Sequence, residues 1–252
     1  MSSSNKPGKT LAVAHTDKAF EADLKEVRGK LLSMGAKVEE QIAGGMRALR
    51  TRDSELAARV KKADREVNLL EVEVDELCRR ILALRQPTAS DLRLITTALK
   101  IVTDLERIGD EAAHIAERAM ELNQAPPLSL ETDLPRLAAL AQEQVKAALD
   151  AFVTADPKAA ETVLNADDRL DDLFVRIFNQ LLGLMMEDSR TIRRATALVS
   201  VSKYLERIGD HAVNLAEMVI YMVRGTDVRH PNSRALVLPS RRRSAEDPAV
   251  SG

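Results

Sequence analysis

The sequence contains one cysteine and very few aromatic residues. Cys78 is the only cysteine among 252 residues, so an intrachain disulfide is impossible and a cysteine-based zinc site is disfavoured. The aromatic fraction is 2% and the formal net charge is −2. These values argue against aromatic platforms for base stacking and against an overall attraction to a phosphate backbone. We therefore expect no nucleic-acid partner and a reducing compartment.

Long apolar runs are also missing. No stretch approaches the roughly eighteen uncharged apolar residues that a membrane-spanning helix needs. The N-terminal sequence "MSSSNKPGKTLAVAHTD" lacks the apolar core of a signal peptide. We expect a soluble, cytoplasmic protein.

The residues that are abundant favour helix. Hydrophobic residues make up 45% of the chain and charged residues 30%, with ten glycines and nine prolines. The strongest internal break is "NQAPPLSLETDLP" at 123–135, because paired prolines cannot continue a helix. The predicted organisation is a flexible N-terminal tail at 1–20, a first three-helix repeat at 21–122, a linker at 123–133, a second three-helix repeat at 134–225 and a C-terminal tail at 226–252.

Each repeat divides into three helical segments. Apolar residues recur every three or four positions in them, as Val67, Leu70 and Val74 do in the first repeat and Leu170, Leu173 and Ile177 do in the second. Short turns between long helices favour antiparallel neighbours. The predicted segments are 21–50, 54–86, 89–122, 134–153, 157–186 and 189–224.

The two repeats match each other along their length. "LERIGD" occurs at 105–110 and again at 205–210, and "ADREV" at 63–67 aligns with "ADDRL" at 166–170. A shared six-residue string in matching helical contexts indicates duplication. We predict an all-α fold of two tandem three-helix bundles related by internal duplication. Because glycine destabilises a helix interior by about 1 kcal/mol, Gly109 and Gly209 indicate a close approach there.

Carboxylates share one face of the repeated segments. Glu106 and Asp110 lie one turn apart, and so do Glu206 and Asp210. In the preceding segments Asp64 aligns with Asp167, and Asn68 aligns with Asp171. One interpretation is an ordinary solvated face. The other is a metal site, because like charges one turn apart are mildly destabilising without a cation, and clustered oxygen ligands suit Mg, Mn, Fe or Zn.

An enzyme interpretation also arises from the first repeat. "EAAH", from Glu111 to His114, has the Glu-x-x-His spacing of di-iron carboxylate bundles. Those sites need the motif on two helices, whereas the second repeat has "HAVN" at 211–214. A redox di-iron centre is therefore poorly supported, and we expect no catalytic site.

Two longer stretches carry a family resemblance. "DLRLITTALKIVTDLERIGDEAAHIAERA" and "RTIRRATALVSVSKYLERIGDHAVNLAEMVIYMVRGTDVRH" make the chain similar to the PhoU family of bacterial phosphate-signalling regulators, over about residues 20–230. The resemblance implies an all-α, dimeric protein that acts with the phosphate ABC transporter and a sensor histidine kinase. It also implies, for some members, multinuclear iron or zinc clusters.

The metal ligands that the resemblance implies fall on matching positions in both repeats. Iron or zinc is favoured over Mg or Mn. Asn68 replaces a carboxylate, so we expect the second site to bind metal more tightly than the first unless Glu71 or His114 compensates. The candidate ligands are Asp64, Glu106, Asp110, Asp167, Asp171, Glu206 and Asp210.

The resemblance predicts a non-enzymatic regulator. The expected function is negative regulation of the phosphate-starvation response and modulation of high-affinity phosphate uptake. The expected partners are the ATPase subunit of the phosphate ABC transporter, the phosphate sensor histidine kinase and a second copy of the chain. Membrane association is expected only indirectly, at the inner membrane through these partners. The alternative is a metal-binding bundle with an enzymatic or storage role.

Overall fold

The structure is a computed structural model that describes residues 10–128 and 132–229, with side chains from residue 18 onward. No strand occurs in these ranges, and the fold is all-α. The helices are α1 (Thr10–Thr51), α2 (Ser54–Leu84), α3 (Ala89–Leu122), α4 (Leu134–Thr154), α5 (Pro157–Glu187) and α6 (Ile192–Arg224), with one 3₁₀ turn, η1 (Ser189–Thr191), before α6. No helix among the described residues is long and apolar enough to cross a membrane.

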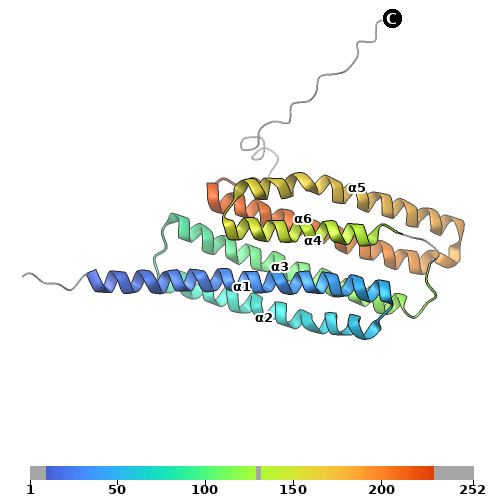
Figure 1. The fold of residues 1–252 in the computed structure, drawn as a ribbon, viewed down its shortest axis with the longest axis horizontal. Coiled ribbons are helices and arrows are strands. Elements are labelled where there is room, and N and C mark those ends of the chain that lie inside the picture. The colour runs from blue at the N-terminus through green and yellow to red at the C-terminus, as the bar shows by residue number, and fades with distance from the viewer. Residues whose placement is uncertain (1–9, 129–131, 230–252) are drawn as a thin grey trace, which may run out of the picture.

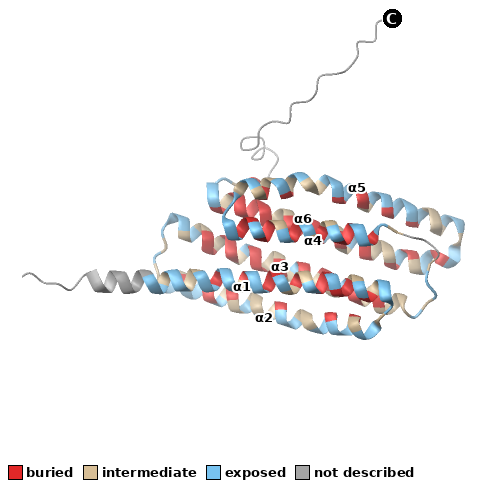
Figure 2. Ribbon diagram, viewed as in Figure 1, coloured by how far each residue is buried: buried red, intermediate tan, exposed pale blue. Residues whose placement is uncertain are grey.

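The six helices form two three-helix bundles that lie side by side. Figure 1 shows α1, α2 and α3 in one bundle and α4, α5 and α6 in the other, with α3 and α6 between the outer helices α2 and α5. Most buried apolar side chains of both bundles belong to one continuous cluster, and a small second cluster lies in the first bundle. Figure 2 shows buried segments in both bundles. The predicted fold class is confirmed.

The helices α3 and α6 run antiparallel where the bundles meet. Arg93, near the start of α3, donates from Nε to the carbonyl oxygen of Met222 near the end of α6, at 3.1 Å. Further along α3, Glu111 pairs with Arg207 near the middle of α6. The residue number of the partner on α6 therefore decreases as the residue number on α3 increases. The two "LERIGD" segments consequently lie opposite each other, where the helices cross.

Aspartate side chains cap the N-termini of the outer helices α2 and α5. The Leu56 amide donates to Asp53 Oδ1 at 2.8 Å, and the Lys158 amide donates to Asp156 Oδ1 at 2.8 Å. Such caps satisfy amides that have no partner within the helix.

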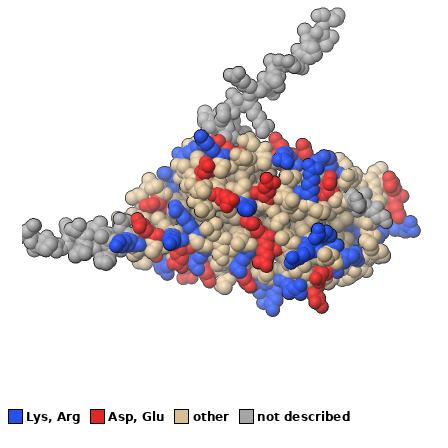
Figure 3. All heavy atoms as spheres, viewed as in Figure 1, with Lys and Arg blue, Asp and Glu red and all other residues tan. Residues whose placement is uncertain are grey.

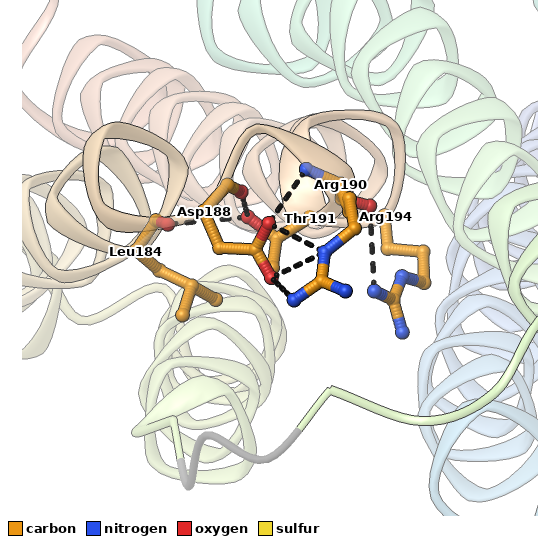
Figure 4. A network of polar contacts seen from close by, with 5 residues as sticks. All are labelled: Leu184, Asp188, Arg190, Thr191 and Arg194. Atoms are coloured by element: carbon orange, nitrogen blue, oxygen red, sulfur yellow. Dashed lines mark hydrogen bonds and ion pairs between the residues drawn. The ribbon is translucent and has the colours of Figure 1, made fainter.

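The turn between α5 and α6 is tied by its own side chains (Figure 4). The Asp188 carboxylate accepts from the Arg190 guanidinium at 3.0 Å, and Thr191 Oγ1 donates to the Asp188 carbonyl oxygen at 2.6 Å. This turn fixes the entry of the chain into α6.

Several observed boundaries differ from the predicted ones, most of all the start of α1, while α2 ends at Leu84 rather than 86 and α6 begins at Ile192 rather than 189. The helix α1 begins at Thr10 rather than near residue 21, because Ala and Leu at 11–14 favour helix and Phe20 and Leu24 pack against the core. At the other end Gly225, in the left-handed conformation, ends α6, yet Val228 is fully buried. The remaining parts of the predicted tails, 1–9 and 230–252, lie outside the described residues, as do linker residues 129–131.

Candidate functional site

The predicted carboxylates gather in two equivalent places, one in each bundle, between its second and third helices. Charge interactions join Asp64 on α2 with Asp110 on α3, and Asp171 on α5 with Glu206 on α6. Glu71 joins the first group, since its charge acts on Glu106. The first acidic cluster is Asp64, Glu71, Glu106 and Asp110, and the second acidic cluster is Asp167, Asp171, Glu206 and Asp210.

The first acidic cluster is electrostatically strained. Burial raises the pKa of Asp64, and the charge of Asp110 raises it further. Burial likewise raises the pKa of Glu106, with additional contributions from Asp110, Glu71 and Asp64. Asn68 donates from Nδ2 to Asp64 Oδ2 at 3.3 Å, so the residue that replaces a carboxylate stabilises the remaining one.

The second acidic cluster shows the same effect more strongly at Asp167. Burial, followed by the charges of Asp171 and Asp210, raises the pKa of Asp167 to about 6. Burial also raises the pKa of Asp171 and of Asp210, and Glu206 adds to both shifts. Negative charge is therefore concentrated at matching positions of the two bundles.

The helical glycines lie directly beneath the clusters. A Cβ atom on Gly209 would lie 2.9 Å from Gln144 Oε1 and 2.9 Å from Leu170 Cδ1. A Cβ atom on Gly109 would lie 3.1 Å from Asp64 Oδ1 and 3.2 Å from Gln41 Oε1. These distances show that the side chains of the first and second helices approach the third helix closely at the glycine.

A buried glutamine accompanies each cluster. Gln41 on α1 and Gln144 on α4 occupy equivalent positions in the two bundles and are 4% and 5% exposed. Within the described residues, the amide nitrogen and oxygen of Gln41 and Oδ1 of Asp64 have no hydrogen-bond partner. Gln144 and Oδ1 of Asp167 form no hydrogen bond of normal geometry, but they lie close enough for Gln144 to lower the pKa of Asp167. Buried polar atoms are usually hydrogen-bonded, so these atoms are available to contact a ligand or water.

Lys203 distinguishes the second acidic cluster from the first. Its Nζ lies 2.7 and 2.6 Å from the two carboxylate oxygens of Glu206 and 5.5 Å from the centre of the Phe174 ring. Its charge lowers the pKa of Asp171 and Asp210, against the larger effect of burial. The second cluster therefore holds a cation of its own.

At the aligned positions the first bundle has no lysine and has an additional carboxylate. Thr103 stands where the second bundle has Lys203, and Glu71 stands where it has Phe174. The first acidic cluster thus has four carboxylates and no lysine at the equivalent place. The carboxylate that Asn68 fails to provide is replaced by Glu71.

The donor chemistry of both clusters fits a hard or borderline cation. The fit rests on the carboxylate oxygens of Asp64 and Asp167 that form no hydrogen bond of normal geometry in the described residues, and on the neighbouring negative charges that raise the pKa of these two residues. Within the described residues, however, no three His, Cys, Asp or Glu side chains are placed to hold one ion together.

The Glu-x-x-His motif has a structural role. Glu111 is 3% exposed, and its Oε1 lies 3.0 Å from Arg207 Nη1 on α6. His114 Nδ1 lies 3.6 Å from the other Glu111 oxygen, and its ring lies 5.2 Å from that of Tyr204. The motif therefore joins the two bundles, which does not favour the di-iron interpretation.

Sequence reasoning missed three residues of the clusters. Gln41 and Gln144 were overlooked because each lies within an apolar stripe, although aligning the first helices of the repeats would have paired them. Lys203 is not part of the acidic pattern on which the predicted site depends. Comparing it with Thr103 would have shown a gain of one positive charge.

Alanine at Gly209 is expected to lower the free energy of unfolding by about 1 kcal/mol. Overpacking against buried Gln144 and Leu170 outweighs the better helix propensity of alanine. The matched control is Gly183→Ala on α5, where a Cβ would have no neighbour within 4 Å, and this change should raise stability by about 0.5 to 1 kcal/mol. Urea unfolding compares the variants. Equal effects of the two substitutions would contradict the close approach.

Asp167→Asn should change how stability depends on pH. Because the pKa of Asp167 is raised from 3.8 to about 6 in the folded chain, the folded chain keeps the Asp167 proton to a higher pH than the unfolded chain does. The contribution of Asp167 to the free energy of unfolding is fully present below pH 4 and is lost as the pH rises through 6. Since the side chain is partly solvated, the variant should gain about 1 kcal/mol over the parent at pH 7.5. Unfolding in EDTA at pH 4.5 and 7.5 tests this, and a pH-independent difference would refute it.

Comparison with known protein families identifies the family to which this chain belongs. A model described as the PhoU domain matches residues 31–119 and again residues 134–219, one match in each bundle. The chain belongs to the PhoU family. Both PhoU matches include the second and third helices that carry an acidic cluster.

Relatives extend the PhoU match over most of the chain. The chain is 45% identical over 219 residues to the phosphate-specific transport system accessory protein PhoU homolog of Pseudomonas aeruginosa, covering 86% of this chain and 90% of the relative. It is 39% identical over 216 residues to the phosphate-specific transport system accessory protein PhoU of Escherichia coli, with 86% and 90% covered.

Solved PhoU structures share the fold. The crystal structure of PhoU from Pseudomonas aeruginosa superposes with a TM-score of 0.79 at 44% identity, covering 82% of this chain and all of that one. The phosphate transport system regulatory protein PhoU from Streptococcus pneumoniae gives a TM-score of 0.77 at 27% identity, covering 84% and 100%.

Proposed function

We propose that this chain regulates high-affinity phosphate uptake and represses the phosphate-starvation response when phosphate is plentiful. The observation that carries the proposal is the PhoU match to both bundles, with relatives named as accessory proteins of the phosphate-specific transport system. In the proposed mechanism the chain is a non-enzymatic adaptor. It would link the ATPase subunit of the phosphate ABC transporter to the phosphate sensor histidine kinase.

The environments of the reactive side chains support a non-enzymatic role. Burial raises the pKa of the Cys78 thiol to about 11, which removes thiolate character at neutral pH. His211 is 8% exposed, and its Nδ1 lies 2.9 Å from Asp104 Oδ1 at the contact between the bundles. These groups stabilise packing and are poorly placed to meet a substrate.

The outer helix α5 offers a surface on which an adaptor could meet a protein. It carries exposed apolar side chains at helical spacing, among them Val175, Phe178, Leu182 and Met186. Exposed apolar stripes of this kind mark protein contact surfaces. Contact with the transporter, the kinase or a second copy would bring the chain to the inner membrane indirectly, from the cytoplasm.

Metal ions, iron or zinc before Mg or Mn, are part of the proposal. The first acidic cluster would hold them through Asp64, Glu71, Glu106 and Asp110. A bound cation there would neutralise the repulsion between carboxylates of α2 and α3 and so stiffen the bundle. Asp167, Asp171 and Asp210 remain candidates in the second cluster, where Lys203 already neutralises Glu206.

Deletion of the gene should activate a phosphate-starvation reporter in phosphate-rich medium by at least tenfold. The physical reason is that, without the adaptor, the transporter has no route by which to hold the kinase in its repressing state. A plasmid copy of the gene should restore repression. The Gly183→Ala variant, whose substitution touches nothing, should restore it equally. Unchanged repression in the deletion strain would disprove the regulatory function.

A further inference from the structure

A pocket with a volume of about 490 Å³ lies where the two bundles and their connection meet. Its walls come from the C-terminal part of α1, the start of α4, the start of α6 and the residues that follow α3. Small-molecule sites commonly have volumes of about 300 to 1,000 Å³ and often lie between domains.

The lining combines apolar walls with positive charge. Met46, Leu49, Leu134 and Leu198 supply apolar surface. Every charged side chain that lines the described part of the pocket is an arginine, although the chain as a whole has a net charge of −2. Figure 3 shows Lys and Arg side chains gathered near the C-terminal end of α1. The lining arginines are Arg47, Arg50, Arg52 and Arg194.

Two of these arginines build the wall. The guanidinium of Arg52 donates to the carbonyl oxygens of Leu122 and Asn123 at 3.1 and 3.0 Å. Arg194, which follows the turn in Figure 4, donates to the carbonyl oxygen of Pro126 at 3.0 Å. They therefore fix the chain that leaves α3 against the pocket.

The other two arginines have no such role. Arg47 and Arg50 lie three residues apart on α1, so their side chains project from neighbouring positions of the helix surface. Within the part of the chain that the structure describes, neither forms an ion pair with a carboxylate. Two adjacent like charges of this kind repel each other unless an anion lies between them.

We propose that this pocket binds a single-chain anionic amphiphile, with a carboxylate or phosphate head on Arg47 and Arg50 and an aliphatic tail against Met46, Leu49 and Leu198. The described lining has no aromatic side chain, which disfavours nucleotides, because bases bind proteins largely by stacking. The residues described around the pocket include four arginines and no carboxylate, which favours an anionic over a cationic ligand.

Calorimetry with the full chain tests the proposal, using dodecanoate below its micelle concentration as the probe. Dodecanoate should bind one per chain, and dodecyltrimethylammonium, which has the same tail and the opposite charge, should bind at least tenfold more weakly. Dodecyl phosphate should also bind, whereas inorganic phosphate and acetate should bind at least tenfold more weakly than dodecanoate. Tight binding of inorganic phosphate, with no gain from a tail, would overturn the amphiphile assignment.

Variants locate the site. Arg47→Gln with Arg50→Gln should weaken dodecanoate binding by about tenfold. Ala43→Trp, at an exposed position of the pocket lining, should block binding. Arg65→Gln with Arg176→Gln, both exposed on the outer helices, is the matched control and should leave binding unchanged. Equal affinity for dodecanoate and dodecyltrimethylammonium, or equal loss of dodecanoate binding in the two double variants, would refute the proposal.

Discussion

Replacing Arg207 with alanine should lower the free energy of unfolding by about 2 kcal/mol. Its guanidinium Nη1 lies 3.0 Å from Oε1 of Glu111, whose side chain is 4% exposed. Removing one partner of a buried ion pair leaves the other charge without solvent or counter-ion, which costs about 3 to 5 kcal/mol when both partners are buried. Arg207 is half exposed and His114 stays near Glu111, so the expected loss is smaller.

The duplication provides a matched control for this prediction. Arg107 occupies the equivalent position in the first bundle, and among the described residues it forms no ion pair with a buried carboxylate. Arg107→Ala should therefore change stability by less than about 0.5 kcal/mol. Adding Glu111→Gln to Arg207→Ala should recover part of the loss, because the unpaired charge is then gone. Similar unfolding midpoints in urea for Arg107→Ala and Arg207→Ala would show that the contact contributes little.

Lys203→Thr should strengthen metal binding at the second acidic cluster by at least about tenfold. The ammonium group lies within 2.7 Å of both Glu206 oxygens, so it competes with a metal for them and repels the metal as well. Threonine is the residue at this position in the first bundle. The reverse change, Thr103→Lys, should weaken the first cluster for the same reason.

Competition titration with zinc and elemental analysis would measure both effects. Lys146→Thr, on exposed α4 surface, is the control for the loss of one lysine. Glu206→Ala with Asp210→Ala should remove the metal gained by Lys203→Thr, and Glu106→Ala with Asp110→Ala should not. If Lys203→Thr and Lys146→Thr bind zinc equally, then Lys203 is not the internal counter-ion.

The sequence was sufficient to predict the helices and the duplication, because both depend on local patterns. Apolar spacing and prolines mark the segments, and "LERIGD" appears in both repeats. The start of α1 was placed too late, since the contact of Phe20 with the core depends on tertiary packing. The expectation that the second site binds metal more tightly considered carboxylates and His114 but no positive charge. The spacing of Lys203 and Glu206 is readable from the sequence, whereas the contact of the Lys203 ammonium with both Glu206 oxygens is a finding of the structure.

The antiparallel crossing of α3 and α6 bears on how such a chain could arise. Since the equivalent helices α3 and α6 pack antiparallel against each other, a chain with a single bundle could bury the same face against a second copy of itself. Such a pair would separate on dilution, whereas two bundles on one chain stay together at any concentration. After fusion a mutation can change one bundle without changing the other, whereas in a symmetric dimer every mutation is present in both copies. The lysine in one half and the threonine in the other are a difference of that kind.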